Sequence, residues 1–178
     1  MEHQPFFLKS LGLVSAAFMS FSWSASGQPE EKPNILWITS EDNSASYMSC
    51  YGNEQATTPN IDELADEGIV YNNAFANAPV SAPARFTIIT GMYASNCGTH
   101  HMRSQKDIPD RFRFFPEYLK EEGYYCTNNA KEDYNLDQED WDRNVEAAWH
   151  KSGYDAHYKN RGEDQPFFAV FNITLSHE

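Results

Sequence analysis

The stretch Asn34-Ile35-Leu36-Trp37-Ile38-Thr39, followed directly by Ser40-Glu41-Asp42-Asn43, decides the fold class of this chain. A short apolar run that stops abruptly at a polar cluster is typical of a buried strand in a parallel sheet. The sequence therefore predicts a strand over 34–39. It also places two adjacent carboxylates, Glu41 and Asp42, at the carboxyl end of that strand.

Helix and strand signals alternate along the rest of the chain. Residues 131–165 are polar and aromatic without a clear period, and they predict a long loop over the site. Strands that alternate with helices favour an α/β fold with a largely parallel sheet flanked by helices, in which ligands bind at the carboxyl ends of the strands. The other predicted helices are 58–68, 81–91 and 116–122, and the other predicted strands are 69–71, 124–127 and 167–171.

The predicted helix at 81–91 begins with Ser81-Ala82-Pro83-Ala84-Arg85. Pro83 suits a first helical turn, and Gly91 can take the left-handed conformation that ends a helix. Arg85 lies four residues after Ser81 and therefore projects from the same face, next to the free N–H groups of the helix N-terminus. This arrangement favours an oxyanion such as sulfate or phosphate, although an ordinary Ser-capped helix with a surface Arg has the same spacing.

Size and charge limit the classes of function. The 178 residues suffice for one domain with its own core, and the formal net charge is −13. Such acidity argues against a nucleic-acid partner and against a surface that binds polyanions in general. An anionic substrate must therefore meet a local basic pocket.

The N-terminus has the order of a secretory signal peptide. Lys9 precedes the apolar run 11–21, and the small residues 24–27 follow. We therefore expect residues 1–27 to be removed and the protein to be secreted or periplasmic, with no stable membrane insertion, because the run is short for a membrane span. A membrane anchor is the alternative.

Three cysteines are present, and three cannot all pair in an oxidising compartment. Two alternatives remain: a disulfide bridge between Cys50 and Cys97, or buried cysteines that are all free thiols.

The run from Lys32 to Arg103 resembles the start of the sulfatase family. The family signature is Cys or Ser, any residue, Pro, any residue, Arg, and then Thr-Gly, and Ser81, Pro83, Arg85, Thr90 and Gly91 fill it. The resemblance implies an alkaline-phosphatase-like sulfatase domain, of which residues 28–178 form the N-terminal part. It also implies that a formylglycine-generating (sulfatase-maturating) enzyme oxidises Ser81 to formylglycine, which Arg85 steadies.

The resemblance assigns further site residues. Glu41 and Asp42, where the family usually has Asp-Asp, would bind calcium together with the oxygen of residue 81, although an exposed acidic turn would look the same. Lys131 would contact the sulfate, but Asp133 stands where the family usually has His. His177 would protonate the leaving group. His101 and Arg103 would contact the substrate.

The sequence therefore predicts a sulfuric ester or N-sulfate hydrolase that acts on sulfated glycans, closer to the sulfamidase-like (heparan N-sulfatase) branch. Because the chain covers only about the first third of the family's domain, we expect an N-terminal fragment that is inactive alone. Two rivals remain: a metal-dependent phosphoester or phosphonate hydrolase of the same superfamily, and a non-catalytic truncated remnant.

Overall fold

The computed structural model describes residues 31–177. The predicted signal peptide, residues 1–27, lies outside this range. The described residues from Lys32 onward form one compact unit. No helix among the described residues has the length and apolar character needed to cross a membrane.

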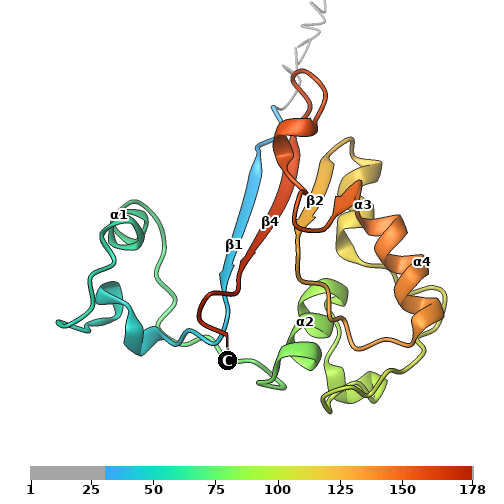
Figure 1. Ribbon diagram of the computed structural model, residues 1–178, viewed down its shortest axis with the longest axis horizontal. Coiled ribbons are helices and arrows are strands. Elements are labelled where there is room, and N and C mark those ends of the chain that lie inside the picture. Colours follow the sequence, from blue (N-terminus) through green and yellow to red (C-terminus); the bar gives the residue numbers. More distant parts are fainter. Residues whose placement is uncertain (1–30, 178) are drawn as a thin grey trace, which may run out of the picture. The chain divides into compact units, whose positions relative to one another are not determined.

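A four-stranded sheet organises this unit. Its strands are β1 (Ile35–Ser40), β2 (Tyr125–Asn129), β3 (Lys151–Ser152) and β4 (Phe167–Ile173), and they lie in the order β1-β4-β2-β3. All three pairings are parallel, and Figure 1 shows β4 between β1 and β2. The predicted parallel α/β sheet is confirmed, and all its carboxyl ends lie at one edge.

Four α-helices connect or flank these strands. They are α1 (Pro59–Glu67), α2 (Ser81–Thr90), α3 (Phe115–Glu121) and α4 (Gln138–Ala148). The first three match predicted helices. Helix α2 ends as expected, because Gly91 adopts φ 71° and its N–H donates to the carbonyl of Thr87 at 2.9 Å.

Helix α4 corrects the prediction of a long loop over 131–165. The carboxylate of Asp137 accepts a hydrogen bond from the N–H of Asp140 at 2.9 Å and caps the helix. Trp141, Val145 and Ala148 follow at helical spacing and pack on or within the core. Strand β3 and the short 3₁₀ helix Tyr158–Asn160 also lie in this segment.

Two other expectations about strands were wrong. Residues 69–71 form no strand, and the side chains of Ile69 and Tyr71 are exposed. Strand β1 exists, but it is an edge strand with β4 as its one partner in the described sheet. Leu36 and Ile38 are therefore more than half exposed rather than buried.

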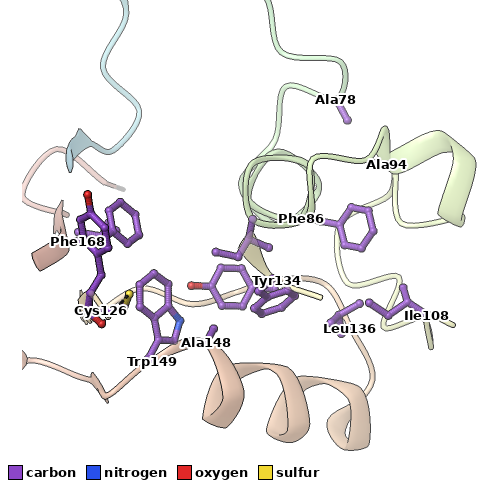
Figure 2. Close-up of a cluster of buried hydrophobic side chains, with 14 residues drawn as sticks. Ala78, Phe86, Ala94, Ile108, Cys126, Tyr134, Leu136, Ala148, Trp149 and Phe168 are labelled. Atoms are coloured by element: carbon purple, nitrogen blue, oxygen red, sulfur yellow. Dashed lines mark hydrogen bonds between the residues drawn. The ribbon is translucent and has the colours of Figure 1, made fainter. Parts of the chain in front are cut away.

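The core joins the sheet to α2, α3 and α4. Phe86 from α2, Phe114 at the start of α3 and Phe168 from β4 are almost fully buried. Phe114 contacts the ring of Tyr134 edge to face at a centroid distance of 4.8 Å, and Trp149 stacks on Phe168 at 5.9 Å. Figure 2 shows the buried cluster, with Phe86, Tyr134, Trp149 and Phe168 among its labelled side chains. This packing fixes α2, and with it Ser81, against the carboxyl edge of the sheet.

Candidate active site

Glu41 is the centre of the site. It follows β1 directly, and its backbone N–H donates to the carbonyl of Ile173 at 2.9 Å, while the hydroxyl of Ser176 donates to its carbonyl. The residue is only 8% exposed. The ends of β1 and β4 therefore hold a buried carboxylate in a fixed place.

The carboxylate of Glu41 gathers three predicted site residues. Its Oε1 accepts hydrogen bonds from Ser81 Oγ at 3.1 Å and from Lys131 Nζ at 2.5 Å, and its Oε2 accepts from Arg85 Nη2 at 3.2 Å. Ser81 and Arg85 therefore do project from one face of α2, as their spacing of four residues predicts. Lys131 reaches the same point from the loop after β2.

Two cations, Arg85 and Lys131, surround the carboxylate of Glu41. The carboxylate of Asp42 lines the same cavity as Glu41, so the formal charges of these four residues balance. Burial alone would raise the pKa of Glu41. The hydrogen bond from Lys131, the charges of Arg85 and Lys131, and the hydrogen bond from Ser81 outweigh burial, so the pKa lies below its ordinary value of 4.5. The site thus holds two partly buried cationic side chains, Arg85 and Lys131, in a strongly acidic protein, and these are the groups that an anionic ligand can contact.

Arg85 is held from its other side by groups that sequence reasoning missed. Its Nη1 donates to Asn172 Oδ1 at 3.0 Å and to the carbonyl of Lys131 at 3.2 Å. Asn172 Oδ1 also accepts from Thr39 Oγ1 at 2.9 Å, and its Nδ2 donates to Asn128 Oδ1 at 3.0 Å. All three polar residues lie at or near strand ends, and that position was the signal that could have found them.

A cavity of about 360 Å³ opens beside Ser81. Glu41, Arg85 and Asn172 line its polar side, and apolar side chains such as Trp37 and Ile88 line the remainder. Its volume is in the range of small-ligand pockets, about 300–1,000 Å³.

Asp42 and His177 form a second, more exposed pair beside Glu41. Asp42 adopts a left-handed φ of 52°, and its Oδ2 lies 2.7 Å from Nδ1 of His177. Glu41, Asp42 and His177 each offer one ligand atom within 4.8 Å of the others. Two carboxylates and an imidazole fit a divalent cation chemically, although both oxygens of Glu41 already accept hydrogen bonds from cationic side chains.

The structure places His101 and Arg103 apart from the cavity at Ser81. The side chain of Arg103 forms an ion pair with Asp133, and Arg103 lines a different cavity. The ring of His101 lies against that of His100 in a tilted arrangement, with 4.2 Å between the ring centroids. Cys50, Cys97 and Cys126 are all free thiols, so a bridge between Cys50 and Cys97 is absent.

Comparison with known proteins decides the family. The sulfatase family model matches residues 33–177. The chain belongs to the sulfatase family. It is 41% identical over 160 residues to an ulvan-active sulfatase of Formosa agariphila, which covers 83% of this chain and 26% of that relative. It is 39% identical over 101 residues to an N-acetylgalactosamine-6-O-sulfatase of Bacteroides thetaiotaomicron, which covers 55% of this chain and 20% of that relative.

A solved structure in complex with its substrate D-glucosamine-2-N,6-O-disulfate shares the fold, with a TM-score of 0.61 at 22% identity. That match covers 82% of this chain and 35% of the other. The predicted sulfatase fold is therefore confirmed, and the chain holds part of the domain. The sulfatase chain spans about a quarter of the length of the curated relatives that it matches.

Proposed function

We propose that the protein that carries this sulfatase chain hydrolyses sulfate groups of sulfated glycans, with a formylglycine made from Ser81 as its nucleophile. The observation that carries the proposal is the convergence of Ser81, Arg85 and Lys131 on Glu41 at the carboxyl edge of the sheet. The substrate class is supported by the ulvan-active and N-acetylgalactosamine-6-O-sulfatase relatives.

The surroundings of Ser81 support its proposed role as the nucleophile. It is the first residue of α2, where free N–H groups favour negative charge, and its Oγ faces the cluster around Glu41. A formylglycine at this position would supply a hydrated aldehyde, which can expel sulfate by returning to the aldehyde, whereas a plain serine ester would be a dead end. A formylglycine-generating (sulfatase-maturating) enzyme that accepts serine is the partner that would oxidise Ser81.

Arg85 and Lys131 would stabilise negative charge on the sulfate. Each side chain is only 16% exposed, so their charges act in a partly desolvated site. Asn172 and the carbonyl of Lys131 hold Arg85 in place independently of Glu41. This fixed orientation is what electrostatic catalysis requires.

Glu41, Asp42 and the oxygen of residue 81 would hold a divalent cation, calcium in our proposal. Such an ion would supply further charge stabilisation to the sulfate oxygens. His177 would protonate the leaving oxygen or nitrogen, with its Nδ1 held by Asp42 so that Nε2 is left for the substrate. We also propose that residues 1–27 export the protein to the periplasm or the medium.

The test is replacement of the nucleophile. Because the chain spans about a quarter of its relatives' length, the assay uses the complete open reading frame that contains these residues, produced together with a formylglycine-generating enzyme. We expect Ser81→Ala to abolish sulfate release from 4-nitrophenyl sulfate and from a pool of ulvan, chondroitin sulfate and heparan sulfate oligosaccharides. Ser46→Ala is the matched control, because Ser46 is exposed and, within residues 31–177, its hydroxyl bonds only to that of Ser44. Full activity of Ser81→Ala would refute the proposal.

A further inference from the structure

A second cavity, of about 460 Å³, lies between the loop residues 103–105, the loop residues 133–137 and the start of α4. Its lining is mainly polar and includes Arg103, Gln105, Asp133, Gln138 and Trp141. The volume again falls in the range of about 300–1,000 Å³ that small-ligand sites occupy. Neither the nucleophile nor the charged cluster around Glu41 uses this cavity.

The two loops are locked together, so the cavity is preformed. Lys106 N–H donates to the carbonyl of Asn135 at 3.3 Å, and Asp137 N–H donates to the carbonyl of Lys106 at 3.2 Å. Asn135 Nδ2 donates to the carbonyls of Thr99 at 2.7 Å and His101 at 2.8 Å. A site that is already formed loses less entropy when a ligand binds.

Four residues that line this cavity have unusual backbone conformations. Arg103, Gln105, Asp133 and Asn135 adopt left-handed φ values of 60°, 46°, 46° and 61°. Asp and Asn tolerate this region, but Arg and Gln rarely enter it. Non-glycine residues in such conformations persist where surrounding contacts enforce them, and they cluster at ligand sites.

The side chains define the ligand's chemistry. The two glutamine amides and the guanidinium offer hydrogen bonds in several directions, and the indole of Trp141 offers an apolar surface, which together suit a polyol with an apolar face. Arg103 is paired with Asp133, and Asp137 adds a second carboxylate to the lining. The lining thus carries one excess negative charge, which disfavours a sulfate or a carboxylate.

The cavity is next to the active site. Tyr134 lines both this cavity and the one beside Ser81. Asp133 is two residues after Lys131, whose ammonium group contacts Glu41. The two cavities therefore adjoin at Tyr134.

We propose that this cavity is a carbohydrate subsite that takes an uncharged sugar residue of the chain whose sulfate is removed at Ser81. The proposal rests on the proposed function. It assigns to Gln105 and Gln138 the task of binding sugar hydroxyls, at a place that the cluster around Glu41 does not reach.

The test compares two substrates with the complete open reading frame and its maturation enzyme. One is 4-nitrophenyl sulfate, which contains no sugar, and the other is the oligosaccharide pool described above. In the double variant Gln105→Gly, Gln138→Ala, glycine accepts the left-handed conformation and both amides are lost. We expect the ratio of kcat/KM for oligosaccharides to that for 4-nitrophenyl sulfate to fall about tenfold, through KM, since two neutral hydrogen bonds are removed.

Gln55→Ala, at an exposed glutamine outside both cavity linings, is the matched control and should keep the wild-type ratio. An unchanged ratio in the double variant would overturn the subsite, and so would an enzyme that hydrolyses 4-nitrophenyl sulfate but no oligosaccharide. If neither substrate is hydrolysed while Ser81 is oxidised, the proposed function itself fails. Chemical reduction of the uronate carboxyl groups in the pool should lower KM, and a higher KM would contradict the uncharged sugar.

Discussion

Replacing Glu41 by Gln should destabilise the protein far more than the same change one residue later, at Asp42. The Glu41 side chain is 7% exposed and neutralises Arg85 and Lys131, whose side chains are each 16% exposed. Gln keeps the shape but removes the charge, so two partly buried cations lose their counterion. The Asp42 side chain is 53% exposed and pairs with His177, which is 46% exposed.

The expected size follows from this burial. Breaking a fully buried ion pair by removing one partner costs about 3–5 kcal/mol. Because Arg85 and Lys131 retain some contact with solvent, we expect about 2–3 kcal/mol for Glu41→Gln, which corresponds to a fall in Tm of about 4–12 °C for a domain of this size. An exposed pair contributes about 0–1 kcal/mol, so Asp42→Asn should shift Tm by at most about 4 °C.

Thermal denaturation in the presence of EDTA measures both variants without a contribution from bound metal. The pKa of Glu41 is lowered in the folded state, so its stabilising effect is present above the ordinary value of 4.5 and is lost as the pH falls through the folded pKa. The gap between wild type and Glu41→Gln should therefore close in acid. Equal shifts for the two variants, or a gap that widens in acid, would refute the reasoning.

Three further predictions test the framework of the site. Asn172→Leu removes a buried amide that binds Arg85 and three other groups, so urea denaturation should show a loss of about 2–4 kcal/mol; an unchanged midpoint would count against the network. Burial raises the pKa of Cys126 to about 12, so at pH 8 only about one thiol in 10⁴ is ionised. Iodoacetamide should therefore label Cys50 well before Cys126, and equal rates would contradict the burial. Burial and the charge of Lys120 lower the pKa of His150 in the folded protein, so the fold favours the neutral imidazole. The stabilising effect of His150 is therefore present above the ordinary pKa of 6.5 and is lost as the pH falls below that value. Tm of His150→Gln should vary less with pH between 7 and 5 than Tm of the wild type, and an equally steep fall would contradict this.

Local patterns predicted the centre of the site well. The spacing of Ser81 and Arg85 on one helix, and the position of Glu41 at a strand end, depend on regular periods and on the edge rule for parallel sheets. Those rules hold over a few residues, and the structure brings all three side chains together as expected.

Features that depend on distant partners were harder to predict. Residues 69–71 have strand propensity, but a strand needs a neighbour to pair with, and these residues have none in the described sheet. The ion pair of Arg103 with Asp133 spans thirty residues, and no local pattern signals it. The position of Asn172 behind Arg85 likewise depends on how β1, β2 and β4 align.

Helix α4 is a different case, because its signal was present in the sequence. Asp137 is a good helix cap, and Trp141, Val145 and Ala148 recur at helical spacing. The many polar residues of 131–165 concealed this pattern. An amphipathic surface helix needs only a narrow apolar stripe, so a polar segment should not be assigned to a loop on composition alone.

The mass of the peptide that contains Ser81 tests the central claim most directly. The full-length protein is produced with and without a formylglycine-generating enzyme, digested, and analysed by mass spectrometry. The sulfatase account predicts a peptide about two mass units lighter than the unmodified one, only with the enzyme and together with sulfate release, because the aldehyde has two hydrogens fewer than serine. An active protein whose Ser81 peptide keeps the mass of serine would contradict the account and favour a phosphoester or phosphonate hydrolase.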